Sequence, residues 1–393
     1  MHNVEIVEIQ DGRERHEMVM FPWTVYRGDK NWVPPIIKDR ARMLDPERNP
    51  FFQQADVALF AARRGGRLVG TIAAFIDRRF NDYLGQKVGF FGLFEVLRDR
   101  EAASGLLGTA RDWVQRRGMT ELRGPINFHR DRERGILVEG DDCPPPMRCG
   151  HSPPYYASFL EGFGMIKHAD DLCRRLWVND IVGPDGKLHP RLARLEKVAQ
   201  RRSHLRIRHG RLDDWDNEVH RVRALYDATI GLLPDHIPWD EDEIVGFAEE
   251  LRPVVDPDFV LFGEVEGETV GCMLAFPDFN QVLIHLDGRQ PRGWRKLLAW
   301  WDMRRIDVLS LKVGGVLEEY QGRGLEALLL LELAKAALPR GFRMVDMSLQ
   351  AEDNDKLTTL VNNFGAQDYK RYRVYKMPLW SAKGTRAERR HTT

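Results

Sequence analysis

A glycine-rich turn in the last third of the chain has the residue types of a phosphate-binding site. Gln321, Gly322, Arg323 and Gly324 stand between an apolar stretch and a leucine-rich one. When such a turn joins a strand to a helix, several backbone N–H groups and the positive end of the helix dipole point at one place. The glycines let an anion approach the backbone closely. The sequence therefore predicts an anion site that needs no basic side chain.

The segments on either side of the turn should hold it in place. Before it, apolar Leu309, Leu311 and Val313 alternate with Ser310 and Lys312, which indicates a strand. After it, leucines recur at helical spacing until a proline, at position 339, ends the run. Further leucines widen the apolar surface, so most of this helix is expected to be buried. The predicted order is strand, glycine turn, helix.

This stretch resembles the acyl-CoA pyrophosphate loop of the GCN5-related N-acetyltransferase (GNAT) superfamily. The family pattern is Gln or Arg, two residues, Gly, one residue, then Gly or Ala, and residues 321–325 fit its first five positions. Glu326 takes the sixth position, where a carboxylate departs from the pattern. Either the helix dipole or Arg323 offsets this charge, or CoA binding is weakened. A helix start without a ligand is a third interpretation.

The resemblance implies an acyl-CoA co-substrate, either acetyl-CoA or a longer acyl-CoA, and no metal. The implied cofactor-binding residues follow the strand end, the turn and the helix start: Val316, Leu317, Gln321, Gly322, Arg323, Gly324, Leu325 and Glu326. Acyl transfer also needs a base for the amine and an acid for the leaving thiolate. Glu318 and Glu319 are the candidate bases, although two solvated carboxylates are the alternative. Asn354 is the third candidate catalytic residue, because the family commonly has an Asn after this next strand.

The tyrosine acid that the family commonly carries is missing from its expected place. Val361 stands there instead. Tyr369, Tyr372 and Tyr375 follow in the chain and could substitute for it, with packing as the alternative role of each. This second departure weakens the family's standard mechanism for this chain.

An internal repeat indicates two related domains in tandem. Residues 56–75, DVALFAARRGGRLVGTIAAF, match residues 258–276, DFVLFGEVEGETVGCMLAF, with one residue lost in the predicted hairpin turn. A strand and a helix precede each copy, and a third strand and another helix follow it. The GNAT resemblance covers nearly the whole chain. It implies an α/β (α+β) fold of two tandem GNAT-like domains, each a mixed, largely antiparallel sheet flanked by helices.

The predicted boundaries follow from this repeat. Residues 1–178 form an N-terminal GNAT-like domain, 179–202 a basic linker helix, 203–380 a C-terminal acyl-CoA-binding domain, and 381–393 a disordered tail. Where the second half has its glycine turn, the first half has the sequence VLRDRE at residues 96–101. Acids at a helix start suit the dipole but repel a diphosphate. The N-terminal domain is therefore predicted to lack the pyrophosphate loop.

A long loop at residues 124–156 is expected to help build the acceptor site. It is rich in Pro, Gly and charge, as functional loops often are. With the apolar segment 231–256 it supplies the candidate substrate-binding residues: Asn127, His129, Glu139, Tyr155, Tyr156 and Trp239. The loop resembles that of a subgroup of tandem bacterial acetyltransferase-like proteins, and the bacterial ceramide synthases are related to the same superfamily. This resemblance implies a primary amine, including an amino-lipid, as acceptor.

Composition limits the partners. Lys+Arg and Asp+Glu both number 59, and the resulting net charge of zero argues against a nucleic-acid partner. Residues 187–211 nevertheless hold nine Lys or Arg and one acid. This basic linker is either a solvated helix or a surface for CoA phosphates or for peripheral contact with an anionic membrane. Without a signal peptide or an apolar run of about 20 residues, a cytoplasmic protein is expected.

The sequence thus predicts an N-acyltransferase that moves an acyl group from acyl-CoA to a primary amine. The alternative is a tandem GNAT-like protein that binds CoA or a metabolite without catalysis. Glu326 and Val361 favour the alternative. The cysteines near His151 fit no zinc pattern, and neither the amine, the acyl length nor the oligomeric state follows from the sequence.

Overall fold

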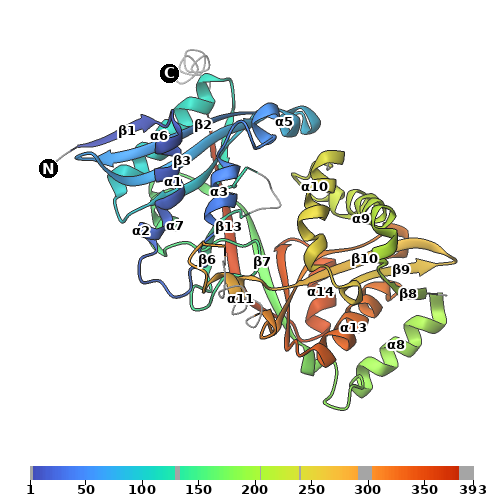
Figure 1. Ribbon diagram of the computed structural model, residues 1–393. Coiled ribbons are helices and arrows are strands. Elements are labelled where there is room, and N and C mark those ends of the chain that lie inside the picture. The colour runs from blue at the N-terminus through green and yellow to red at the C-terminus, as the bar shows by residue number, and fades with distance from the viewer. Residues whose placement is uncertain (1–2, 129–132, 204, 239, 291–302, 380–393) are drawn as a thin grey trace, which may run out of the picture. The chain divides into compact units, whose positions relative to one another are not determined.

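The computed structural model describes residues 3–128, 133–203, 205–238, 240–290 and 303–379 (Figure 1). Two predicted site residues, His129 and Trp239, lie outside this part of the chain, as does the predicted tail at 381–393. Contacts within the chain define two compact units. Unit 1 comprises Met1–Asp171, Asn280–Ala299 and Lys370–Thr393, and unit 2 comprises Leu172–Phe279 and Trp300–Tyr369.

Unit 1 is built on a mixed sheet. Its strands lie in the order β1 (Val4–Glu8), β2 (Ala55–Arg64), β3 (Arg67–Asp77), β4 (Val88–Val96), β5 (Glu121–Gly124) and β13 (Gln367–Pro378), and β6 (Ile136–Glu139) also pairs with β13. Strands β4 and β5 are parallel, whereas the other pairs are antiparallel. Strand β13 begins in unit 2, because the division falls after Tyr369.

Helix α6 (Arg100–Arg116) packs on the sheet of unit 1. Two strand glycines permit this close approach, since a Cβ at Gly89 or Gly70 would lie within 3 Å of α6 side chains. The other helices among the described residues of unit 1 are α1 (Gly12–Met20), α2 (Pro22–Val25), α3 (Ile37–Met43), α4 (Phe51–Gln54), α5 (Arg78–Leu84), α7 (Tyr155–Gly162) and α11 (Asn280–Leu283). Stacked and edge-to-face phenylalanines, among them Phe51, Phe75 and Phe128, form part of the core.

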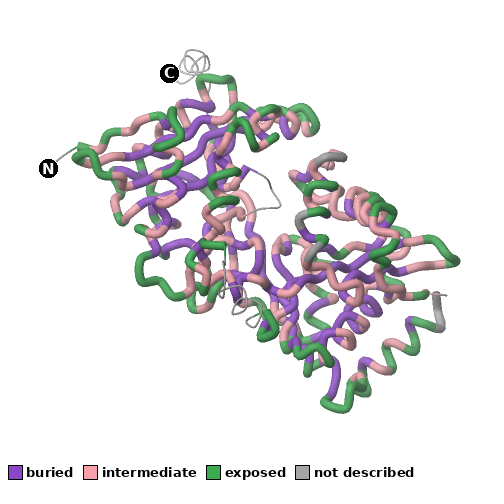
Figure 2. Tube along the Cα trace, viewed as in Figure 1, coloured by how far each residue is buried: buried purple, intermediate pink, exposed green. Residues whose placement is uncertain are grey.

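Unit 2 repeats this plan. Its strands lie in the order β8 (Leu205–His209), β9 (Val260–Val265), β10 (Glu268–Pro277), β11 (Val308–Val316) and β12 (Met344–Ala351), with β11 and β12 parallel. Strand β7 (Ile166–Trp177) contributes residues to both units. The central strands of each unit are largely buried, as Figure 2 shows.

Helices cover both faces of the sheet in unit 2. Helices α9 (Trp215–Thr229) and α10 (Glu241–Leu251) lie on one side, and α8 (Pro190–Ser203), α13 (Leu325–Ala337) and α14 (Asp355–Asn363) lie on the other (Figure 1). Short 3-10 helices complete the chain: Val178–Asp180, Leu212–Asp214, Ile230–Leu232, Arg252–Val254, Pro257–Phe259, Glu318–Tyr320 and Leu338–Arg340. Within the described residues, no helix is both long enough and apolar enough to span a bilayer.

The predicted fold class is confirmed. Both repeated hairpins form, as β2–β3 and β9–β10, and each is followed by a strand and then by a helix on the sheet. The leucine-rich helix after the glycine turn is α13, with nine of its residues buried. The helix expected in the basic linker is α8, which lies in unit 2.

Candidate functional site

The predicted anion site lies where two parallel strands of unit 2 stop pairing. Strands β11 and β12 pair from Val308 opposite Met344 to Leu311 opposite Met347, and no further. Immediately beyond, Lys312 is the extra residue of a β-bulge, because Leu311 and Val313 pair with consecutive residues of β10. Strand β11 ends at Val316, and the chain then forms the 3-10 helix Glu318–Tyr320 and enters the glycine turn. The turn is tied back to the strand, since Gln321 Nε2 donates to the Val316 carbonyl oxygen at 2.9 Å.

The turn has the conformation that its glycines predict. Gly322 and Gly324 have φ values of 70° and 98°, in the left-handed region. Gly324 precedes α13 directly and offers no side-chain cap, so the first N–H groups of the helix stay free to bind an anion. Lack of space also requires glycine at position 324, because a Cβ there would lie 2.9 Å from the Cβ of Ala199 in α8.

Glu326 folds back onto this turn. The Gly322 N–H donates to Glu326 Oε1 at 3.3 Å, so the carboxylate takes up one of the donors that an incoming phosphate would use. Arg323 instead lies over the Tyr320 ring, 5.2 Å from its centroid. Lys356 Nζ donates to Gln321 Oε1 at 3.1 Å and brings a positive charge close to the turn. The turn can therefore hold an anion, and Glu326 competes with it.

A buried polar network, which was not predicted from the sequence, lies at the point where β11 and β12 separate. Asp346 is fully buried and accepts three hydrogen bonds: from Ser310 Oγ at 2.8 Å, Ser348 Oγ at 2.6 Å and Tyr369 Oη at 2.7 Å. Lys312 Nζ donates to Ser348 Oγ at 3.0 Å and lies 3.6 Å from Asp346 Oδ2. The sequence signal was polar residues at alternate positions of two central strands, which the register brings together.

This network could act on an acyl group. The side chain of Lys312 is only 9% exposed, so its nitrogen lies in a site of low dielectric constant. A positive charge in such a site stabilises developing negative charge more strongly than it would in water. Asp346 and Ser348 fix the direction of the Lys312 side chain across the gap between the strands.

The predicted catalytic residues are less well placed. Glu318 and Glu319 are both exposed. Asn354 caps α14, where its Oδ1 accepts from the Leu357 N–H at 3.1 Å. Val361 is buried in the same helix. Of the three tyrosines that could supply the acid, Tyr369 belongs to the Asp346 network, whereas the hydroxyls of the other two bond to groups in unit 1.

In unit 1, the gap beyond the paired part of β4 and β5 is closed by residues of the same unit. Strands β4 and β5 pair only as far as Phe90 opposite Arg123. Beyond this pair, the Ile126 N–H donates to the Phe91 carbonyl at 2.8 Å, and Asn127 Oδ1 accepts from the Leu93 N–H at 2.7 Å. These bonds close the gap between the separating strands from within the protein.

The start of α6 in unit 1 is likewise satisfied from within. Asp99 Oδ1 accepts from the Ala102 N–H at 3.1 Å and so caps the helix. Arg64 binds both Asp99 and Glu101, at 2.9 and 2.7 Å. A capped, acidic helix start has little attraction for a diphosphate.

Three predicted acceptor residues form hydrogen bonds in unit 1, and one of them, Tyr156, bonds to the half-buried carboxylate of Glu95. Tyr156 Oη donates to Glu95 Oε2 at 2.8 Å and accepts from the Val96 N–H at 2.8 Å. Tyr155 Oη donates to the Val96 carbonyl at 2.9 Å, and Asn127 Nδ2 donates to Glu133 Oε2 at 2.8 Å. Glu139 is not part of this group, because it is exposed on β6 and pairs with Arg371 at 3.1 Å.

Glu95 itself was not among the site residues predicted from the sequence. Burial raises its pKa to about 7, while the hydrogen bond from Tyr156 and the charge of Arg40 oppose the rise. Burial also raises the pKa of Tyr26, whose hydroxyl donates to the His151 carbonyl at 2.8 Å. The only signal was an acid at the end of the apolar strand KVGFFGLFE.

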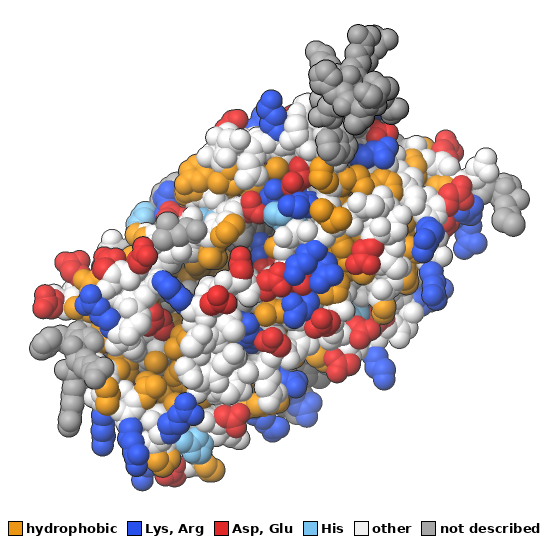
Figure 3. All heavy atoms as spheres, turned by 180° about the vertical axis from the view of Figure 1, so that it is seen from behind, with side chains coloured by type: hydrophobic (Ala, Val, Ile, Leu, Met, Phe, Trp, Pro, Cys, Tyr) orange, Lys and Arg blue, Asp and Glu red, His pale blue; other side chains and the backbone are white. Residues whose placement is uncertain are grey.

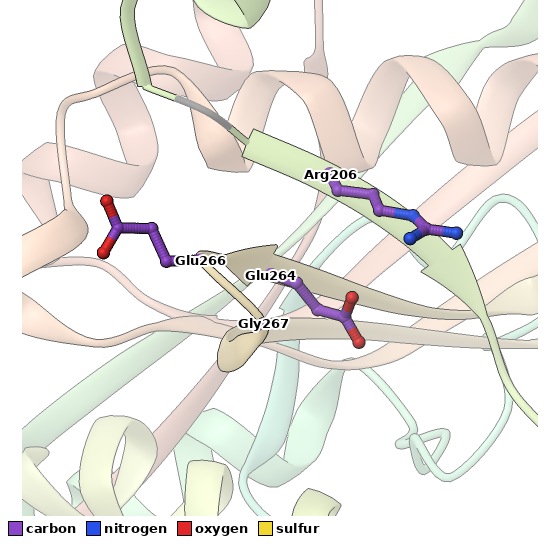
Figure 4. Close-up of a pocket in the computed structure, with 4 residues that line it drawn as sticks. All are labelled: Arg206, Glu264, Glu266 and Gly267. Carbon is purple, nitrogen blue, oxygen red and sulfur yellow. The ribbon is translucent and has the colours of Figure 1, made fainter.

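A surface hollow in unit 2 contains none of these residues. It is lined by Arg206, Glu264, Glu266 and Gly267, from β8, β9 and the turn between β9 and β10 (Figure 4). The four residues offer opposite charges side by side, and no chemistry follows from them. Within the described residues, no cluster of three or more His, Cys, Asp or Glu side chains could hold a metal ion.

Solved structures define the class of fold. The structure is similar to that of a tandem GNAT protein from the clavulanic acid biosynthesis pathway, with a TM-score of 0.55 and 14% sequence identity. The alignment covers 97% of this chain and 100% of that protein's chain. A GCN5-related N-acetyltransferase from Sphaerobacter thermophilus covers 95% of both chains, with a TM-score of 0.53 and 13% identity. The chain has the tandem GNAT fold, as its sequence predicts.

Two proteins resemble the chain along its length. The bacterial ceramide synthase of Caulobacter vibrioides is 29% identical over 389 residues, which cover 96% of this chain and 98% of that protein. Protein YghO of Escherichia coli is 28% identical over 368 residues, or 92% of each chain. No protein-family model matches the chain. The predicted relation to ceramide synthase-type proteins is thus confirmed as a similarity.

Proposed function

We propose that the protein is an N-acyltransferase whose unit 2 binds acyl-CoA and transfers the acyl group to a primary amine. The observation that carries this proposal is the uncapped glycine turn at the start of α13, which follows the part of β11 that has separated from β12. Such a turn suits the diphosphate of CoA, and the gap between the strands suits the extended chain that joins it to a thioester. The cytoplasm remains the proposed compartment.

An amino-lipid is the proposed acceptor. The support is similarity to a protein named bacterial ceramide synthase, since a ceramide is an amide of a fatty acid and a long-chain amino alcohol. The donor would then be a long-chain acyl-CoA. Acetyl-CoA remains the alternative donor, because the structural neighbours are named acetyltransferases.

The proposed reaction is direct attack of the neutral amine on the thioester carbon. A C–N bond forms, the C–S bond breaks, the nitrogen loses a proton and the thiolate gains one. We assign to Lys312 the stabilisation of the negative charge that develops during this exchange. Glu318 and Glu319 remain the candidate proton acceptors, and Asn354 supports the site by capping α14. For unit 1 we propose an acceptor-side role without a cofactor of its own.

A non-catalytic CoA- or metabolite-binding protein is the second candidate. The bond from the Gly322 N–H to Glu326 favours it, because a carboxylate already occupies part of the turn. Weak cofactor binding and no turnover would be its signature.

Thiol release separates the two candidates. The purified protein is incubated with acyl-CoAs of increasing length and a panel of amines that includes long-chain amino alcohols, and free thiol and amide product are measured together. The enzyme proposal predicts thiol release that depends on an amine and matches the amide formed. Measurable CoA binding without amine-dependent release would favour the second candidate.

A further inference from the structure

Helix α8 is fixed to α13 along one side. Leu192 and Ala199 are buried, and Lys335 of α13 pairs with Glu196 at 2.5 Å. Ala199 also lies against Gly324, the last residue of the glycine turn. The basic linker is therefore a packed element of unit 2, held beside the proposed cofactor site.

The other side of α8 combines apolar and basic side chains. Leu195 is 36% exposed and Val198 is 50% exposed. Arg191, Arg194 and Lys197 are exposed as well, and helical spacing places the first two beside the aliphatic pair. Glu196 is the single acid of the helix, and it is engaged with Lys335 on the packed side. Basic side chains gather at the lower left of Figure 3, over this helix.

We propose that this outer face of α8, comprising Arg191, Arg194, Leu195, Lys197 and Val198, docks on an anionic phospholipid bilayer. Amphipathic helices of this composition lie in the headgroup layer, with aliphatic side chains inserted and basic side chains against the phosphates. Two aliphatic residues alone give weak binding, so the basic residues must supply the rest. Each basic residue near an anionic surface contributes about 1 kcal/mol, or about a fivefold gain in affinity.

A bilayer fits this face better than the other anionic partners. The exposed side chains of Leu195 and Val198 would not be buried by hydrated phosphates, whether free or on a nucleic acid. They would be removed from water at the boundary between the headgroups and the acyl chains of a bilayer, which is favourable. Because α8 packs on the glycine turn through Ala199, a membrane bound at α8 would lie close to the proposed cofactor site. Long-chain acyl-CoA and an amino-lipid both partition into bilayers. That last advantage rests on the proposed function, whereas docking itself does not.

Vesicle flotation tests the proposal on the full chain. We expect binding to phosphatidylcholine vesicles that contain phosphatidylglycerol, little binding to pure phosphatidylcholine, and weaker binding as salt is added. The triple variant Arg191→Gln, Arg194→Gln, Lys197→Gln should bind the anionic vesicles at least tenfold more weakly. Val198→Asp should weaken binding too, while leaving the three basic residues in place.

A matched control removes the same charge elsewhere. Arg13→Gln, Lys38→Gln and Arg42→Gln together take three exposed positive charges from unit 1 and should change binding less than twofold. Equal loss in both triple variants would overturn the proposal, since net charge would then explain the binding. Equal binding of the wild type to neutral and anionic vesicles, or to neither, would overturn it as well.

Coenzyme A affinity, measured by calorimetry on the same variants, separates this proposal from the proposed function. The α8 triple variant should keep its CoA affinity while losing vesicle binding. If it loses CoA affinity and keeps vesicle binding, the basic residues serve the cofactor and the docking proposal fails. If the wild type binds vesicles but no CoA, docking stands and the proposed function fails.

Discussion

Lys312 is the residue on which the chemistry of unit 2 depends most directly. In the sequence it occupies a polar position of an alternating strand, a pattern that normally indicates a solvent-facing side chain. Its burial could not be predicted, because it results from the register that sets Ser310 opposite Asp346 and from the β-bulge that turns Lys312 towards Ser348. Pairwise register between distant strands is not encoded in local patterns.

Replacement of Lys312 by Met should slow acyl transfer. Loss of the ammonium removes charge stabilisation in the transition state, and kcat should fall about 100-fold with little change in KM for acyl-CoA. Asp346 would still accept from Ser310, Ser348 and Tyr369, so the variant should fold. Steady-state kinetics and a thermal melt check this outcome.

Two further variants sharpen that experiment. Lys312→Arg keeps a positive charge and should recover part of the rate. Lys187→Met removes a lysine whose side chain is 83% exposed, and it should behave as the wild type. Unchanged kcat in Lys312→Met would exclude the assigned role.

Glu95 should make the stability of unit 1 depend on pH. Burial raises its folded-state pKa from 4.5 to about 7. The group therefore favours the folded state at low pH, and that contribution is lost as pH rises from about 4.5 to about 7. The shift corresponds to about 3 kcal/mol. The Gln side chain of Glu95→Gln cannot ionise. The free energy of unfolding of this variant, measured with urea, should therefore increase relative to that of the wild type between pH 5 and pH 8. Exposed Glu139→Gln is the control, and an identical pH profile for Glu95→Gln would contradict the assignment.

At the scale of elements, the strand, glycine turn and α13 could be predicted because local signals agree. Leucine spacing gives the helix, and two glycines give the left-handed turn. The position of α8 could not be predicted. Its contact with the turn depends on Ala199 meeting Gly324, and nothing in a basic amphipathic sequence says which neighbour it covers. The closure of the unit 1 gap by Asn127 is equally non-local.

Glu326 should tune the affinity of the turn for CoA. Glu326→Ala restores a residue that the family pattern allows, frees the Gly322 N–H and removes a negative charge near the diphosphate. CoA should bind about fivefold more tightly, in line with about 1 kcal/mol for one nearby charge. Glu326→Gln, which keeps the shape, separates charge from hydrogen bonding. Isothermal titration gives the dissociation constants, and unaltered affinity in both variants would mean that the diphosphate does not bind at this turn.

At the scale of the whole molecule, the repeat predicted two related parts, but not which distant segments join each of them. Residues 280–299 group with unit 1. There, Trp23 Nε1 donates to Asp287 Oδ1 at 2.7 Å, and the Ile37 N–H donates to the Gly288 carbonyl at 2.9 Å. Lys370 Nζ likewise donates to the Cys143 carbonyl at 2.7 Å. Such contacts cross more than a hundred residues of sequence, so a division in chain order misses them.

The central claim is that the glycine turn of unit 2 holds the acyl-CoA that reacts. Gly324→Ala tests it, because a methyl group at φ 98° would both strain the turn and crowd Ala199. Gly341→Ala is the matched control: its φ is 86°, but a Cβ there meets nothing within 4 Å. The deciding measurement is amine-dependent thiol release from long-chain acyl-CoA by the wild type and both variants. We expect release by the wild type and Gly341→Ala, and at least a tenfold loss of kcat/KM in Gly324→Ala. Equal release by all three proteins, or none by the wild type, would contradict it.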